Sequence, residues 1–466
     1  MCIYTMAKQW RGGVLRGQTG RCPHKIAKVY SSKTLPLVQP SNPDYIHLTH
    51  AVSMAVTEKQ LQTMVMDPYR WLPRQVTTVN STGLSGAEYF RGGNMLESVA
   101  WMWHANRTGI AVCIRNGELA MFVPFCNPNY TNTWSTGARQ QVPRCGLAPE
   151  HWWANGWTLC GDVVSPQLWG DQGICSIQNM LMVACERGIM ADCDFIINKR
   201  DSACVRLDSC DPMNPIDAYQ QPCKRSFQLV PILSLYTGDQ FADIAMPLPS
   251  DWHRLSRGTF QAQNPLPVRV RPKKIAWADK LDCAIFRGSL TGTGSCSYTN
   301  QRIALLMRHD GRNLDLRGTG ANRRYRYCPL QRRIVVPSGG NLDIGRHHLM
   351  PLHVQQERYR YSITIDGHSG ADRLAALADG GQIIFKVNAP YHALCPETWA
   401  SQRMHAWEHY IPVQRDMSDL LDNLAWARGN RDACNRILRI CDTWAASERN
   451  RILQWWVDAA AAFNAL

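Results

Sequence analysis

The stretch YRYSITIDGHSGADRLAALADGGQIIFKV, from Tyr359 to Val387, decides the fold. Its first part alternates aromatic and β-branched residues up to Gly367, which is typical of a buried strand. A turn follows, then a predicted helix over 371–378 that Gly380 and Gly381 end. The apolar run after it predicts a second strand, and HYIPV (409–413) a third. Strand, turn, helix and strand in this order build a parallel sheet, so we predict an α/β protein.

The turn before the helix predicts a diphosphate site. The start of a helix offers free N–H donors and a partial positive charge, which attract phosphate. Glycine flanks the turn at Gly367, and Ser369 or the turn backbone would cap the helix. Arg373, in the first turn, adds a guanidinium that can bind two phosphate oxygens. On residue types alone, the alternative is that Arg373 is a solvated surface residue that binds no phosphate.

A longer pattern adds a family resemblance. YRYSITIDGHSGADRLAAL, GGQIIFKV and HAWEHYIPVQRDMSDLLDNLAWARGN together resemble the C-terminal signature of family-ninety glycosyltransferases. These are capsule-associated-protein-like enzymes that include protein O-glucosyl- and O-xylosyltransferases. The resemblance covers roughly 176–460. It implies the GT-B arrangement, in which two Rossmann-like domains face a cleft and the C-terminal helix crosses back to the first domain. The implied reaction is an inverting, metal-independent transfer from a UDP-sugar, with glucose or xylose favoured, to a glycan or protein hydroxyl.

Two further segments resemble the family's catalytic and acceptor regions. DCDFIINKRD (192–201) predicts a strand, and the resemblance makes Asp201, just past its end, the general base for the acceptor hydroxyl. An aspartate in a surface ion pair or a turn is the alternative. FADIAMPLPSDW (241–252) resembles a loop that lines the cleft. Within it, Trp252 could as easily be a packing anchor.

FRGS (286–289) follows a predicted strand and matches the family's donor-binding motif. The Gly/Ser/Thr turn after it can hold phosphate through its backbone N–H groups. The resemblance assigns the nucleotide-sugar to Ser289, Arg302, Arg373, Ser369, Gly367 and Arg287. It assigns the substrate cleft to Asp243, Trp252, His409 and Tyr410.

HAWEH (405–409) also spells H-x-x-E-H, the pattern of a zinc-peptidase helix. Pro412 follows almost at once and breaks any helix that continues through it. We therefore predict no metal site at this sequence. The family resemblance implies a UDP-sugar as the donor substrate, with no metal and no cofactor.

Composition leaves other classes of function open. One alternative is a nucleic-acid-binding protein, which the net charge of +14 and the arginine-rich run 308–333 favour. No nucleic-acid-binding motif accompanies these features. A catalytically inactive protein of the same fold that binds nucleotide-sugar or glycan is the other alternative. The sequence contains no apolar run of about 18 residues, so we predict no membrane span. The first residues lack the apolar core of a secretory signal, so we predict a cytoplasmic protein of viral or microbial type.

The length of 466 residues predicts more than one domain. We divide the chain into a basic tail (1–40), an acceptor-side domain (41–265), a nucleotide-sugar domain (266–430) and C-terminal helices that pack back on the first domain (431–466). The Pro-rich, basic run 264–274 is the predicted linker. Within the first domain, Asn116-Gly117 between two apolar runs predicts a β-hairpin.

Overall fold

The computed structural model places the stretch that decides the fold in one parallel sheet, the C-terminal sheet. It describes residues 90–106, 108–126, 171–187, 190–198, 200, 203–205, 207, 229–239, 241–256, 272–292, 297, 300–320, 326–328, 333–335, 342–367, 369–389 and 395–466. The predicted tail and most of the predicted linker lie outside these residues, so the domain boundaries stay predictions.

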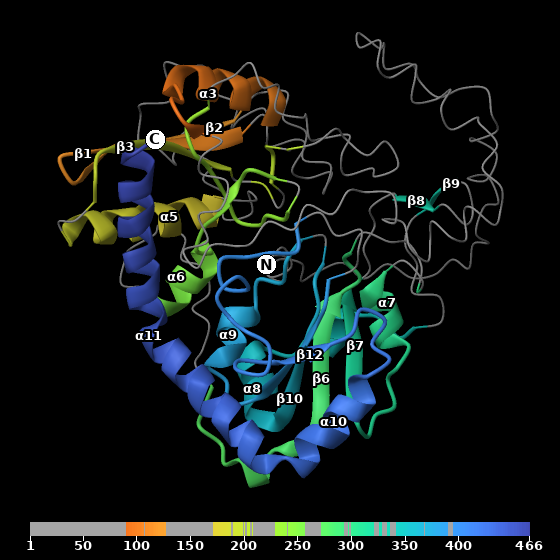
Figure 1. Cartoon of the computed structure of the whole chain (residues 1–466). Helices are drawn as coiled ribbons and strands as arrows, with labels where there is room; N and C mark the ends of the chain where they lie inside the picture. The colour runs from red at the N-terminus through yellow and green to blue at the C-terminus, as the bar shows by residue number, and fades with distance from the viewer. Residues whose placement is uncertain are drawn as a thin grey trace, which may run out of the picture. The chain divides into compact units, whose positions relative to one another are not determined.

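The C-terminal sheet has the strand order β12-β11-β10-β6-β7, and every neighbouring pair in it is parallel (Figure 1). Its strands are β6 (Leu281–Ser289), β7 (Leu314–Gly320), β10 (Tyr359–Thr364), β11 (Ile383–Val387) and β12 (Ile411–Val413). The central strands β10 and β11 are buried along nearly their whole length, as expected for a parallel sheet covered on both faces. The predicted parallel sheet is confirmed.

Short helices lie between these strands or follow the last of them. They are α7 (Gln301–Leu306), α8 (Leu352–Arg358), α9 (Leu374–Ala378) and α10 (Leu420–Gly429), with the 3₁₀ turns η7 (Trp277–Asp279) and η9 (Arg346–His348). A two-stranded ribbon, β8 (Arg326–Cys328) and β9 (Arg333–Val335), lies between β7 and η9 in the sequence. Helix α7 begins after Asn300, whose side chain accepts from the backbone N–H groups of Arg302 and Ile303 at 3.0 and 3.1 Å.

A second sheet, formed by the earlier part of the described chain, has the order β2-β1-β3-β4-β5. Its strands are β1 (Thr108–Arg115), β2 (Glu118–Cys126), β3 (Cys193–Asn198), β4 (Ile232–Ser234) and β5 (Ile244–Ala245). Strands β3, β4 and β5 are parallel, whereas β1 is antiparallel to both its neighbours. Asn116 and Gly117 have φ values of 53° and 75°, which confirms the predicted hairpin turn.

The helices of this region are α3 (Met95–Trp101), the π-helical turn η3 (Met102–Asn106), α5 (Asp171–Glu186) and α6 (Pro249–Ser256). The long last helix α11 (Arg431–Asn464) contacts α5 and β3 as well as α9 and β11 (Figure 1). Trp456 of this helix is buried against Phe195 of β3, with ring centroids 5.8 Å apart. Contacts of α11 therefore reach elements of both sheets.

The chain is thus an α/β protein with two sheets rich in parallel strands, compatible with Rossmann-like folds. The facing of two domains in the GT-B manner stays a prediction. Within the described residues, no helix combines the length and the apolar character needed to cross a membrane.

Candidate functional site

The strand order creates a reversal point between β6 and β10. From β6 the chain proceeds outward to β7, and from β10 it proceeds to β11 on the other side. Open parallel sheets bind ligands beside the carboxyl ends of the strands at such a reversal. FRGS forms the carboxyl end of β6, and Ile365, Asp366 and Gly367 follow β10. Two of the sequence-predicted donor residues, Ser289 and Gly367, therefore lie at the edge of the sheet where a ligand is expected.

Arg302 spans this reversal point from the first turn of α7. Its guanidinium donates to the carbonyl oxygen of Ser289 at 3.1 Å and to those of Ile365 and Asp366 at 3.0 Å each. It also donates to the hydroxyl of Thr291. Burial, and after it the positive charge of Arg373, lowers the pKa of Arg302 to about 10. The side chain is thus a buried cation that donates to three carbonyl oxygens and a hydroxyl.

Arg373 approaches the same point from the start of α9. Its Nη1 donates to the carbonyl oxygen of Arg287 at 2.7 Å. Both guanidiniums lie near the ring of Phe286, with Cζ 5.7 Å from its centroid for Arg373 and 5.9 Å for Arg302. Two like charges in a partly buried place repel each other, and an anion bound between or beside them would relieve that repulsion.

Phe286 is a site residue that the sequence interpretation missed. Its side chain is 1% exposed, and its ring lies over Gly288, where an added Cβ would be only 2.7 Å from Cζ. Because side chains alternate along a strand, Arg287 points to the opposite face of β6 from Phe286. There Arg287 forms an ion pair with Asp315 at 2.7 Å. The alternation of side chains along a strand, applied to FRGS, was the signal that places Phe286 and Arg287 on opposite faces of β6.

The turn after β10 holds a buried carboxylate. Asp366 accepts from the backbone N–H of Ala371 at 2.9 Å through Oδ1, while its buried Oδ2 has no hydrogen-bond partner among the described residues. Burial raises the pKa of this group. Helix α9 begins at Leu374 without a side-chain cap, so Asp366 rather than Ser369 organises the turn.

Gly367 and Ser369 shape the same turn. The N–H of Gly367 donates to the carbonyl oxygen of Ser369 at 2.9 Å. A Cβ on Gly367 would lie 2.8 Å from Oγ1 of Thr291 and 3.1 Å from Nη2 of Arg302. Glycine is therefore needed for the arginine to reach across the reversal point.

A cleft of about 320 Å³ lies beside Lys386 of β11. The side chains that line it are Lys386, Ala389, Pro396, Glu397, Ser401 and Gln402. Lys386 lines the cleft, and its positive charge favours the ionised forms of both Asp366 and Glu397. Burial raises the pKa of Glu397, so this cleft combines a cation with an acid that holds its proton unusually well.

Asp201, the predicted base, lies outside the described residues. The described residues on either side of it are anchored at the end of β3. Asn198 is fully buried and donates to Ser234 at 3.0 Å. Asp243 accepts from the backbone N–H groups of Cys204 at 2.9 Å and Val205 at 2.7 Å. Asp243 is itself 3% exposed, so the structure gives it an anchoring role beneath the surface.

The other three residues assigned to the cleft occupy different places. Trp252 is fully buried in α6 and donates to Asn179 at 2.8 Å, as a packing anchor does. His409 lies under α11, with its ring 5.6 Å from that of Trp444. Tyr410 is partly buried and lies beside Lys386, whose Nζ is 5.6 Å from the ring centroid. Of these three, Tyr410 contacts a residue that lines the cleft.

The H-x-x-E-H sequence forms a turn, in which Nδ1 of His409 accepts from the N–H of His405 at 3.0 Å. It is not the helix that a zinc peptidase needs. Among the described residues, only Asp343, His347 and His348 form a group of three that could hold a metal ion, and they follow β7 in the sequence.

Comparison with known proteins matches this sequence to a family. A model of glycosyl transferase family 90 matches residues 173–458, more than half of the chain. The chain is 29% identical over 386 residues to uncharacterized protein 035R of Invertebrate iridescent virus 3, covering 75% of this chain and 34% of that protein. It is 27% identical over 379 residues to uncharacterized protein 027R of Frog virus 3, covering 72% and 38%.

A cellular relative matches a shorter region. Protein O-glucosyltransferase 3 of Rattus norvegicus is 25% identical over 210 residues, covering 45% of this chain and 37% of that protein. The chain therefore spans about a third of the length of these curated relatives.

Proposed function

The chain belongs to glycosyl transferase family 90, and we propose that it transfers a sugar from a nucleoside diphosphate donor to a hydroxyl acceptor. The observation that carries the proposal is the pair Arg302 and Arg373 beside Phe286 at the reversal point of the C-terminal sheet. A diphosphate leaving group gains negative charge as the glycosidic bond breaks. Fixed guanidiniums in a partly buried place stabilise such charge more strongly than water does.

We propose UDP as the leaving group and glucose or xylose as the sugar. The sugar class is suggested by the family resemblance and by the name of the rat relative, a protein O-glucosyltransferase. The cleft beside Lys386 and Glu397, at about 320 Å³, falls within the size range of small-molecule sites and lies next to the turn after β10. We assign the transferred sugar to it.

The reaction that we propose is inverting and independent of metal. The acceptor hydroxyl loses its proton to Asp201 and attacks the anomeric carbon from the face opposite UDP. The bond from that carbon to the diphosphate oxygen breaks, and its electrons stay on UDP. Arg302 and Arg373 then supply the positive charge that a metal ion supplies in other transferases. The described residues on either side of Asp201 support its assignment as the base, because Asn198 ends β3 and Asp243 holds the backbone of Cys204.

The test is the release of UDP from a panel of UDP-sugars in the presence of EDTA. Three variants accompany the wild type: Arg373→Ala, Asp201→Asn and Arg439→Ala. Arg439 is an exposed residue of α11. Arg439→Ala therefore removes one positive charge, as Arg373→Ala does, but at a position away from the site. We expect one donor to be turned over despite EDTA, weak donor binding in Arg373→Ala, and binding without turnover in Asp201→Asn.

Two outcomes would contradict the proposal. Absence of both UDP release and UDP binding in the wild type would exclude a donor site. Binding of UDP without turnover, across all donors and with simple hydroxyl acceptors added, would favour an inactive nucleotide-sugar-binding protein.

A further inference from the structure

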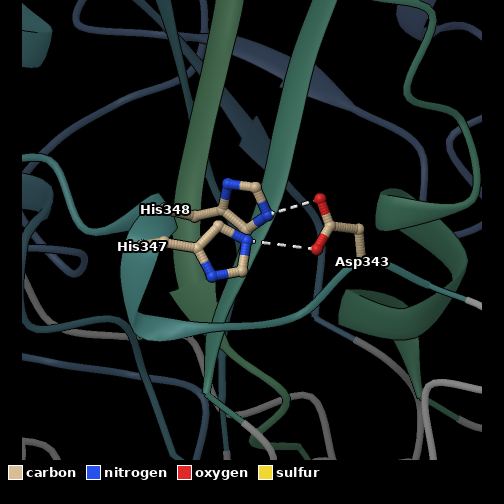
Figure 2. A group of neighbouring side chains, drawn as sticks. All are labelled: Asp343, His347 and His348. Atoms are coloured by element: carbon tan, nitrogen blue, oxygen red, sulfur yellow. Dashed lines mark hydrogen bonds and ion pairs between the residues drawn. The ribbon is translucent and has the colours of Figure 1, made fainter.

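We infer that Asp343, His347 and His348 form a binding site for a divalent transition-metal ion of the zinc type. Figure 2 shows both imidazoles turned toward the one carboxylate. Nε2 of His347 lies 3.2 Å from Oδ1 of Asp343, and Nε2 of His348 lies 2.8 Å from Oδ2. The ligand atoms of all three residues lie within 4.8 Å of one another.

The backbone around these side chains is fixed to the end of β7. Ile344 pairs with Gly318 in a parallel bridge, and the N–H of Gly345 donates to the carbonyl oxygen of Gly318 at 3.0 Å. The turn η9 then carries both histidines back past Asp343. A Cβ on Gly345 would lie 2.4 Å from two atoms of the His347 ring. Glycine at this position thus makes the space in which His347 folds back toward the carboxylate.

The separations of the ligand atoms fit a small tetrahedral ion. Bonds of about 2.0–2.2 Å from zinc to imidazole nitrogen and carboxylate oxygen place neighbouring ligand atoms about 3.3 Å apart. The two nitrogen–oxygen distances, 3.2 Å to Oδ1 and 2.8 Å to Oδ2 of the one carboxylate, are within about 0.5 Å of that spacing. Binding an ion therefore requires only small movements of side chains that already converge.

The types of ligand select the class of ion. Two imidazoles and one carboxylate suit zinc, nickel, copper or cobalt, whereas magnesium and calcium prefer oxygen ligands alone. Three protein ligands leave a fourth position of a tetrahedral zinc for water. Asp343 and His347 are exposed, so an ion in solution has access to the group.

One neighbouring cation opposes the ion. Nη1 of Arg317 lies 3.5 Å from Oδ2 of Asp343, and its Nε lies 3.9 Å from Asp315. An ion on Asp343 repels this guanidinium, which can move toward Asp315. Replacing Arg317 with methionine removes the competitor and keeps an apolar stem of similar length. This variant should bind zinc more tightly than the wild type does.

The site is independent of the proposed transferase reaction. Its ligands follow β7, and none of them belongs to the donor residues at the ends of β6 and β10. An ion there would join Asp343 to the turn η9 and hold residues 343–348 in place. The prediction of a metal-independent transfer is therefore compatible with a zinc ion at this position.

The test is a zinc titration of the full chain without an affinity tag, followed by calorimetry at neutral pH. The variants are His347→Ala, His348→Ala, Asp343→Asn and Arg317→Met, with His353→Ala of the neighbouring helix α8 as the histidine control. Removing a residue that only hydrogen-bonds to a metal ligand weakens metal binding about 10–100-fold. Removing a ligand itself should therefore weaken zinc binding at least about tenfold. His353→Ala should bind zinc as the wild type does.

Because the chain also contains 18 cysteines, a second readout locates the ion. Diethyl pyrocarbonate modifies accessible imidazoles, and the modified peptides are identified by mass spectrometry. We expect zinc to protect His347 and His348, with no protection of His353. Thermal unfolding without metal checks that each variant is folded. Zinc binding that is unchanged in the His347→Ala/His348→Ala double variant, or zinc that leaves both histidines fully reactive, would overturn the inference.

Discussion

Replacing Gly288 with alanine tests the packing on which the donor site rests. The new methyl group would lie 2.7 Å from Cζ of Phe286, whereas ordinary contacts begin at 3.4 Å. The ring must therefore withdraw by at least about 0.7 Å into a close-packed interior. Overpacking of this kind costs about 1–3 kcal/mol of unfolding free energy. The movement also displaces the ring beside which Arg302 and Arg373 lie, so UDP binding should weaken together with stability.

Urea unfolding followed by tryptophan fluorescence measures the loss, and calorimetry measures UDP binding. Gly429→Ala is the matched control, because an added Cβ there meets nothing within 4 Å. That change should leave stability the same or raise it by up to about 1 kcal/mol. In the double variant Gly288→Ala/Phe286→Leu, the two costs should be less than additive because leucine lacks Cζ. A Gly288→Ala protein as stable as the wild type would refute the placement of the ring over Gly288.

Two further changes test buried carboxylates. Asp243→Asn replaces one acceptor oxygen by a donor next to the N–H groups of Cys204 and Val205, so it should cost about 1–3 kcal/mol in urea unfolding; unchanged stability would contradict the anchoring role. Burial raises the pKa of Glu448 from 4.5 to about 7, against the attraction of Arg254 at 2.5 Å. The folded state then holds a proton that the unfolded state releases, so stability should fall as pH rises from about 4.5 to about 7 and stay low above it. Glu448→Gln should reduce the difference in unfolding free energy between about pH 5 and about pH 8, measured by urea unfolding. An unchanged difference would mean that other groups cause the pH dependence.

Local sequence patterns predicted the elements of the fold well. The hairpin at Asn116-Gly117 depends on two residues that accept positive φ, and such turn chemistry is visible in the sequence. The strand from Tyr359 and the helix and strand after it follow from hydrophobic periodicity alone. The start of α9 was less predictable. The helix begins at Leu374 because Asp366, five residues before Ala371, organises the turn.

The candidate site was predicted only in part, because its geometry depends on residues distant in the sequence. Arg302 and Arg373 were expected at the donor, and the structure brings both to Phe286. Arg287 was expected there too, but Asp315 on the neighbouring strand holds its side chain on the other face of β6. That partner is visible only once β6 and β7 are paired.

The burial of aromatic residues was equally hard to predict. Tryptophan suits both a sugar-binding cleft and a packed core, and its residue type does not separate the two. Trp252 proves fully buried, and Asn179 of α5 accepts its indole N–H. His409 is covered because α11, more than twenty residues later, places Trp444 against it.

The most direct test of the account is calorimetric binding of UDP, with EDTA present, to the wild type, Arg373→Ala and Arg439→Ala. A hydrogen bond to a charged group contributes about 1.5–3 kcal/mol, so loss of Arg373 should weaken UDP binding by about tenfold to a hundredfold. Arg439→Ala should bind UDP like the wild type, and uridine should bind poorly to all three proteins. UDP binding that is equal in Arg373→Ala and the wild type would contradict a diphosphate site at the reversal point between β6 and β10.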